Sequence, residues 1–133
     1  MKKYLLDTNI CIFYFKGKYG VQKRLQHIGY ENCAISEITL AELVYGAECS
    51  VDFEKNMNII NNFVQCVQTL PVLNAIGIYA KEKAALRKTG NMIDDLDIFI
   101  GATAIANNMI LVTENEKHLN RLSGIQIENW IER

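Results

Sequence analysis

Three carboxylic acids in this sequence stand in stretches that otherwise have the composition of a protein interior. Asp7 follows directly on the apolar run Tyr-Leu-Leu, Glu42 lies inside Leu-Ala-Glu-Leu-Val, and Asp97 lies inside Leu-Asp-Ile-Phe-Ile-Gly-Ala. An unpaired buried carboxylate costs several kcal/mol, so it needs a cation, a set of hydrogen bonds or a raised pKa. The spacing of these acids therefore indicates a functional site, with a bound cation as one way to stabilise it.

Each acid also has a structural explanation. Asp7 is placed to cap a helix that follows it, a common use of aspartate. Glu42 shares one helical face with Ile38, Ala41 and Tyr45, and that face can be the exposed edge of an amphipathic helix. Asp97 is harder to explain as a solvated charge, and we expect Gly101, one turn later, to remove side-chain bulk beside it.

Two further acids precede Asp97. Asp94 and Asp95 stand where a helix begins, and acids there favour the helix dipole and cap free N–H groups. We expect this structural use for Asp95. Asp94 lies one turn before Asp97, so it is a secondary candidate for the same cleft.

Three carboxylates in one cleft suit Mg²⁺, which takes oxygen ligands and keeps several waters. Such an ion lowers the pKa of a bound water and neutralises charge on a phosphodiester. The net charge of −1 argues against a general polyanion-binding surface. A cation held by the acids would let the cleft bind phosphate despite that charge.

The pattern of apolar residues predicts an α/β fold with a parallel sheet covered on both faces, in one continuous domain over 1–133. Because ligands bind beyond the carboxyl ends of such strands, Asp7 is well placed. The expected strands are 3–7, 33–35, 67–70, 109–113 and 125–128, and the expected helices are 8–15, 21–28, 37–49, 52–65, 73–88 and from 94 or 95 to about 107.

The four cysteines are widely spaced, without a CxxC pair, which favours free thiols over zinc or disulfides. The apolar stretch near the N-terminus meets Asp7 after three residues, too short for a secretory signal. We therefore expect a cytoplasmic protein.

Four motifs together resemble the PIN-domain family, and most closely the VapC toxins of bacterial VapBC toxin–antitoxin pairs. They are Leu-Leu-Asp-Thr-Asn-Ile (5–10), Thr-Leu-Ala-Glu-Leu-Val-Tyr-Gly (39–46), Asp-Leu-Asp-Ile-Phe-Ile-Gly-Ala-Thr-Ala (95–104) and Leu-Val-Thr-Glu-Asn-Glu-Lys-His-Leu (111–119). The ending Ile-Gln-Ile-Glu-Asn-Trp (125–130) also matches. Each motif alone is weak, but the ordered set covers essentially the whole chain.

The resemblance implies a Mg²⁺-dependent endoribonuclease, with Mn²⁺ able to substitute, on a three-layer α/β/α sandwich with four or five mostly parallel strands. It implies a homodimer, a structured RNA substrate of the tRNA or rRNA class, and neutralisation by a VapB-type antitoxin. By position, Asp7, Glu42 and Asp97 match the three family acids and Asn115 matches the fourth polar position. Thr8, Asn9 and Thr113 are then candidates for hydrogen bonds around these groups.

A basic run near the end of the expected helix 73–88 is usually a solvated face, but Arg87 or Lys88 can also contact RNA phosphate or an acidic partner. We expect His27 and His118 to be surface residues, which disfavours a metal-free ribonuclease that uses a histidine pair. One alternative is a PIN-like module that binds RNA or a partner without cutting, which Asn115 keeps open. Another α/β Mg²⁺ enzyme is disfavoured, because the Asp-x-Asp of phosphatases reads Asp-x-Asn here.

Overall fold

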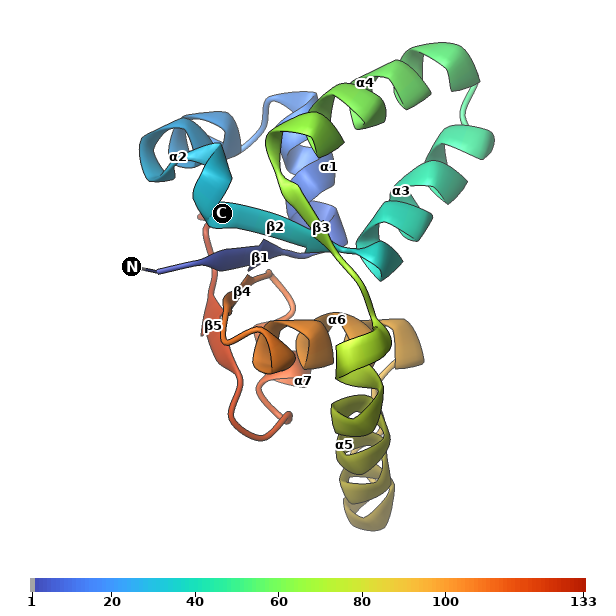
Figure 1. Ribbon diagram of the computed structural model, residues 1–133, viewed down its shortest axis with the longest axis vertical. Helices are drawn as coiled ribbons and strands as arrows, with labels where there is room; N and C mark the ends of the chain where they lie inside the picture. The colour runs from blue at the N-terminus through green and yellow to red at the C-terminus, as the bar shows by residue number, and fades with distance from the viewer. Residues whose placement is uncertain (1) are drawn as a thin grey trace.

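A five-stranded parallel sheet forms the centre of the computed structural model, which describes residues 2–133. Figure 1 shows its strands crossing the middle of the molecule. The strand order is β3-β2-β1-β4-β5, so the first strand of the chain lies in the middle of the sheet. The strands are β1 (Tyr4–Leu6), β2 (Cys33–Ser36), β3 (Gln68–Leu70), β4 (Ile110–Val112) and β5 (Gln126–Glu128).

The central strand β1 is buried on both faces, as its continuous apolar sequence predicts. Leu5 pairs with Ala34 on one side and with Leu111 on the other. Tyr4 and Leu6 belong to the core on one face of the sheet, and Leu5 belongs to the core on the other. The residues after β1, β2 and β4 therefore meet at one edge of the sheet, at their shared carboxyl ends.

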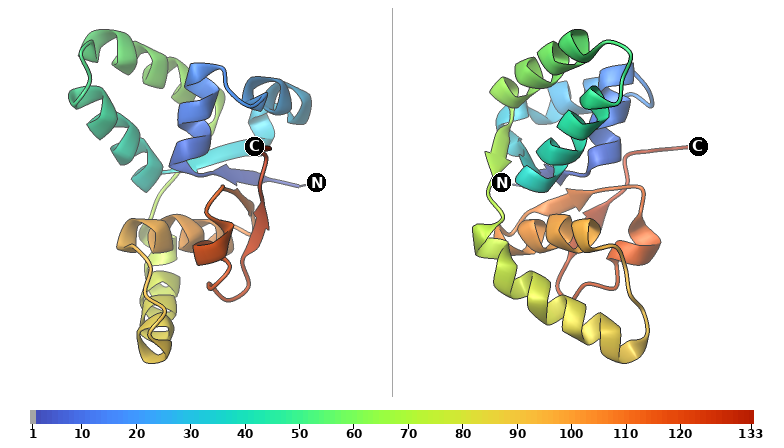
Figure 2. Two further views of the ribbon diagram at one scale, coloured as in Figure 1. Left: turned by 180° about the vertical axis from the view of Figure 1, so that it is seen from behind. Right: turned by 90° about the vertical axis from the view of Figure 1, so that its right-hand side faces the viewer.

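Helices cover both faces, which confirms the expected three-layer α/β/α arrangement. In Figures 1 and 2 the first four helices lie on one side of the sheet and the last three on the other, and α5 extends away from the sheet. The first group is α1 (Thr8–Lys16), α2 (Val21–Ile28), α3 (Glu37–Glu48) and α4 (Phe53–Cys66). The second group is α5 (Ile76–Thr89), α6 (Asp95–Ala106) and α7 (Glu116–Leu119).

The sequence predicts most helix boundaries within one or two residues, because capping residues mark them. Ser36 accepts a hydrogen bond from the Thr39 N–H at the start of α3, and Asp52 does the same for Lys55 at the start of α4. Gly90 ends α5 in the left-handed conformation, with φ 71°.

Three local features differ from the predicted elements. A 3₁₀ turn over Tyr30–Asn32, which was not predicted, precedes β2. The helix expected from residue 73 begins with a 3₁₀ turn over Leu73–Ala75, and the α-helix proper starts at Ile76. The one-turn helix α7 was not predicted, because four residues are too few to show a helical period. None of the helices within residues 2–133 is long and apolar enough to cross a bilayer.

Candidate active site

Asp7 lies where β1 ends and α1 begins, and both of its carboxylate oxygens accept hydrogen bonds. Oδ1 accepts from the Thr8 N–H at 2.8 Å and Oδ2 accepts from the Thr113 hydroxyl at 2.7 Å. The residue is only 8% exposed, and burial raises the pKa of its carboxyl although both bonds oppose this. Asp7 therefore caps α1, as its structural explanation requires, and also presents a carboxylate at the sheet edge.

Glu42 is held toward Asp7 by the residue between them in space, Thr8. The Thr8 hydroxyl donates to Oε1 of Glu42 at 2.6 Å, and the Thr8 and Thr39 hydroxyl oxygens are 3.1 Å apart. The buried positions of α3 are Thr39, Leu43 and Ala47, so half-buried Glu42 lies beside that face.

The helical face that Glu42 shares with Tyr45 is the exposed edge of an amphipathic helix, as the structural explanation allows, since Tyr45 is 70% exposed. Glu42 stands at the edge of the core, where its carboxylate reaches solvent.

Asp97 lies in the first turn of α6 and is half-buried. Its pKa is raised to about 6, first by burial and then by the negative charges of Asp7, Asp94 and Glu42. These repulsions show that acids from three separate segments converge on one region. Asp97 is therefore the acid whose charged form is most costly without a cation.

The role predicted for Gly101 is wrong. A Cβ at this position would overlap the Leu122 side chain and crowd that of Ile125. Gly101 therefore lets α6 pack against the segment that leads into β5, and it does not make room beside Asp97.

An open pocket of about 440 Å³ contains the converging acids. It includes all three predicted acids, the predicted polar residues Thr8 and Asn9, and both residues after Thr113. Its lining is Asp7, Thr8, Asn9, Glu42, Asp97, Glu114 and Asn115. Glu114 is the residue that the sequence analysis missed, although it stands beside Asn115 in the fourth motif.

Asn115 lines the pocket and is held in place by hydrogen bonds to Thr113 and His118. Its N–H donates to the Thr113 hydroxyl at 2.9 Å, and that hydroxyl donates to Asp7. Its side-chain Oδ1 lies 2.8 Å from Nδ1 of His118. His118 is exposed, as expected, and it fixes the Asn115 side chain.

The remaining candidates lie outside the pocket lining. Asp94 stands at the N-cap position of α6 with an exposed carboxylate, close enough to raise the pKa of Asp97. Asp95 lies in the first turn of α6, where an acid favours the helix dipole as expected, but the N-cap position belongs to Asp94 and Asp95 forms an ion pair with Lys83 at 2.8 Å.

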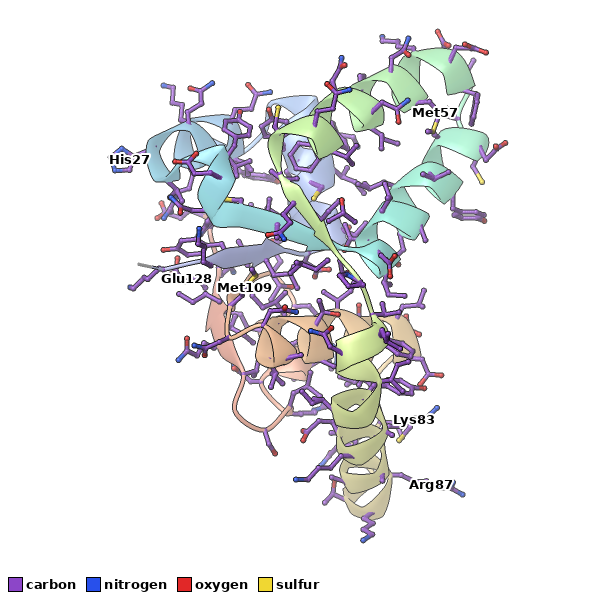
Figure 3. The ribbon with its side chains drawn as sticks, viewed as in Figure 1. His27, Met57, Lys83, Arg87, Met109 and Glu128 are labelled. Atoms are coloured by element: carbon purple, nitrogen blue, oxygen red, sulfur yellow. The ribbon has the colours of Figure 1, made fainter. Side chains whose placement is uncertain are left out.

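Arg87 and Lys88 lie in a different part of the molecule. They line a separate hollow on α5, and Figure 3 shows Arg87 near the far end of that helix. If these two residues contact RNA or a partner, as predicted, they do so on a surface away from the acids.

The donor set suits a hydrated magnesium ion better than a directly coordinated transition metal. Across residues 2–133, no three His, Cys, Asp or Glu side chains are placed to hold a metal ion directly. Mg²⁺ needs only one or two carboxylates and retains several waters, and the pocket offers carboxylates, hydroxyls and amides around an open volume. The residues present therefore fit this ion.

Comparison with known proteins gives the family. The family model described as PIN domain matches residues 4–125. The chain belongs to the PIN-domain family. This PIN domain is 34% identical over 131 residues to the tRNA(fMet)-specific endonuclease VapC of Shigella flexneri, covering 98% of this chain and 99% of that protein. It is 35% identical over 133 residues to ribonuclease VapC2 of Haemophilus influenzae strain Rd, with 98% and 100% covered.

Solved structures of VapBC proteins are also similar to this PIN domain. VapBC2 from Rickettsia felis, bound to a DNA fragment from its promoter, matches with a TM-score of 0.89 and 32% identity over 96% of this chain and 98% of that chain. DNA-bound VapBC from Salmonella typhimurium matches with the same TM-score and identity over 98% and 99%. The resemblance to VapC-type PIN domains is thereby confirmed.

Proposed function

We propose that this PIN domain is a Mg²⁺-dependent endoribonuclease, the toxin of a type II toxin–antitoxin module, which cuts a structured RNA of the tRNA or rRNA class and so inhibits translation. The convergence of Asp7, Glu42 and Asp97 on one open pocket carries this proposal. The names of the relatives, a tRNA(fMet)-specific endonuclease and a ribonuclease, support the RNA substrate. Such a substrate favours a cytoplasmic location.

The hydrogen bonds of the pocket residues suggest a different catalytic role for each of them. Asp7 and Asp97 would hold Mg²⁺, or Mn²⁺ in its place, which when bound supplies an acidified water and neutralises phosphate charge. Glu42 has Oε1 held by Thr8, and its other oxygen would take a proton from the attacking water. Asn115, fixed by His118, orients a water or a phosphate oxygen.

A VapB-type antitoxin is the proposed partner, and a groove beside the acids suits it. The groove has a volume of about 420 Å³ between α1, α3 and α4, and it shares Glu42 with the acid pocket. Ile12, Phe15 and Leu43 give the groove an apolar lining. Ile10, which also lies on α1, does not contribute to it because its side chain is fully buried in the core. A segment of the antitoxin lying here would block Glu42. Homodimerisation is part of the same proposal.

A second candidate is a PIN domain that binds RNA or a partner without cutting. Asn115, an amide where a fourth acid would bind a cation more strongly, favours it. The two functions differ in whether the RNA backbone is broken.

The deciding experiment measures cleavage of total tRNA and rRNA by purified protein with Mg²⁺, with Mn²⁺ and with EDTA. We expect cleavage with either ion, none with EDTA, and a loss of at least about a hundredfold for Asp7→Asn or Asp97→Asn. Asp95→Asn, prepared identically, is the matched control, because Asp95 lies on the same helix outside the pocket lining. Equal cleavage by Asp97→Asn and Asp95→Asn would contradict the proposal, and intact RNA bound by the wild type would favour the second candidate.

Induced expression tests the toxin role in the cell. Arrested translation with the wild type and normal translation with Asp97→Asn is the expected result. Rescue by a VapB-type antitoxin, with a complex that contains two copies of this chain, would support the partner and the homodimer. A complex that contains only one copy of this chain would contradict the homodimer.

A further inference from the structure

An arginine and a tyrosine lie together at one border of the acid pocket, outside its lining. Arg133 donates from Nε to Oε2 of Glu114 at 2.7 Å and from Nη2 to Oε1 at 3.0 Å. Its guanidinium carbon lies 5.3 Å from the centre of the Tyr19 ring. Because Glu114 lines the pocket, this cation lies next to the acids.

Tyr19 is held in an unusual backbone conformation. Its φ is 58°, in the left-handed region that bulky residues rarely adopt, and it lies in the loop between α1 and α2. The loop glycines Gly17 and Gly20 have φ values of 66° and 68°. The ring packs edge-to-face on Phe13, with centroids 4.9 Å apart, yet the residue is 40% exposed. Strained residues of this kind persist where the surroundings hold them, often at binding sites.

The pairing with Glu114 orients Arg133 without using all of its donors. The two bonds involve Nε and Nη2, and within residues 2–133 no hydrogen bond occupies Nη1. The side chain is 62% exposed. A guanidinium fixed in this way binds a phosphate with little loss of conformational freedom.

We propose that Tyr19 and Arg133 form a subsite for one nucleotide of single-stranded RNA beside the phosphodiester that is cut. The exposed part of the Tyr19 ring stacks on the base, Arg133 binds the phosphate, and Glu114 is a positioning residue for Arg133. Unpaired RNA bases are bound by this combination of aromatic ring and cation. The subsite rests on the proposed function, because it assigns the substrate contacts of the same pocket.

The location favours RNA over the antitoxin. The apolar groove proposed for the antitoxin is lined by α1, α3 and α4, and neither Tyr19 nor Arg133 is among its lining residues. A pocket of acids repels a polyanion on its own, so a fixed cation at its border matters more here than in a basic protein.

RNA binding is measured in the Asp97→Asn background, which removes cleavage and leaves the subsite intact. The probes are a fluorescent single-stranded RNA of mixed sequence and total tRNA, titrated at several salt concentrations. We expect Tyr19→Ala to raise Kd about tenfold and Tyr19→Phe to leave it unchanged, since the ring supplies the stacking. Arg133→Ala should raise Kd and reduce the slope of log K against log salt by about one.

Arg24→Ala is the matched control, because Arg24 also lies over an aromatic ring, at 5.4 Å from that of Trp130. It should bind RNA like the parent protein. Glu114→Gln should weaken RNA binding less than Arg133→Ala, since it leaves the cation in place. All variants must keep the parent melting temperature within a few degrees.

Several outcomes would overturn the subsite. They are unchanged RNA binding by both Tyr19→Ala and Arg133→Ala, equal losses with Arg24→Ala, or weakened binding of antitoxin alone. A change in Mn²⁺ affinity with Arg133→Ala that Glu114→Gln reverses would show that Arg133 only neutralises Glu114. If instead the wild type cuts no RNA but these variants still lose RNA binding, the nuclease proposal fails, and Tyr19 and Arg133 are RNA contacts of a PIN domain that binds without cutting.

Discussion

The Thr113 hydroxyl donates a 2.7 Å hydrogen bond to the Asp7 carboxylate across 106 residues of sequence. Thr113 follows β4 and Asp7 follows β1, and these strands are neighbours in the sheet. The same hydroxyl accepts from the Asn115 N–H at 2.9 Å. One buried hydroxyl thus joins two of the predicted site residues, and it fixes both relative to the sheet.

Replacing Thr113 with Val should damage the site more than the fold. The change keeps the shape but leaves Oδ2 of Asp7 and the Asn115 N–H each without this partner, at a cost of about 1–3 kcal/mol, while Oδ1 of Asp7 keeps its bond from the Thr8 N–H. Loss of a hydrogen bond that orients a metal ligand typically costs roughly 10–100-fold in metal affinity. Mn²⁺ titration and urea unfolding measure the two effects.

Thr103→Val is the matched control for that substitution. Thr103 is also buried, but its hydroxyl donates to the Phe99 carbonyl of its own helix. It should leave Mn²⁺ affinity unchanged. Equal Mn²⁺ affinities for the two variants would show that the Thr113 hydroxyl does not organise the site.

The raised pKa of Asp97 predicts how stability depends on pH. The carboxyl titrates near 6 in the folded chain and near its ordinary value of 3.8 in the unfolded chain, so the folded state binds this proton more tightly. The free energy of unfolding should therefore fall as pH rises from about 4 to about 6. Asp97→Asn removes this loss, and without metal it should melt a few degrees higher than the wild type at about pH 8.

The two proteins should converge in melting temperature below about pH 4, where Asp97 is protonated in both states. Thermal unfolding in EDTA at both pH values measures the difference. A melting temperature of Asp97→Asn below that of the wild type at about pH 8 would mean that the carboxylate stabilises the metal-free fold.

Magnesium should reverse that ranking at neutral pH. An ion that binds only the folded state stabilises it by about 2.7 kcal/mol at a concentration of 100 Kd. We expect Mg²⁺ to raise the melting temperature of the wild type above pH 6, where Asp97 is charged, and to do so much less at lower pH. An equal rise for Asp97→Asn would place the ion elsewhere.

Gly101→Ala tests the contact between α6 and the segment that leads into β5. The added methyl overlaps Leu122, so we expect a loss of about 1–3 kcal/mol in the free energy of unfolding. Gly46→Ala is the control, because within the described part of the chain its Cβ would point into open space on α3. Alanine there should stabilise by up to about 1 kcal/mol. Comparable denaturant midpoints for both variants would contradict the packing described for Gly101.

The sequence predicts the layers and the meeting of the three acids in one pocket, for reasons that are local. Short apolar strands have no polar face, and caps such as Ser36 mark where helices begin. Asp97 stands out because its neighbours in sequence are also its neighbours on the helix. For Glu42 the sequence leaves open whether its helical face is exposed, since that depends on how α3 packs against the sheet.

Contacts between distant segments escape such analysis. Glu114 and Arg133 are 19 residues apart and meet only because the chain after β5 returns to the pocket. The reason for Gly101 likewise lies with Leu122 and Ile125, on a segment whose path is set by the tertiary structure. No local periodicity or motif in the sequence indicates these contacts.

The order of strands in the sheet also sets when the acid site can be completed during synthesis. β1 emerges first from the ribosome, but its neighbour β4 and the Thr113 hydroxyl come more than a hundred residues later. A growing or prematurely released chain that ends before α6 carries Asp7 and Glu42, with Thr8 bonded to both, but it lacks Asp97 and Thr113. We therefore expect chains that end before α6 to lack ribonuclease activity, although they already contain two of the three acids.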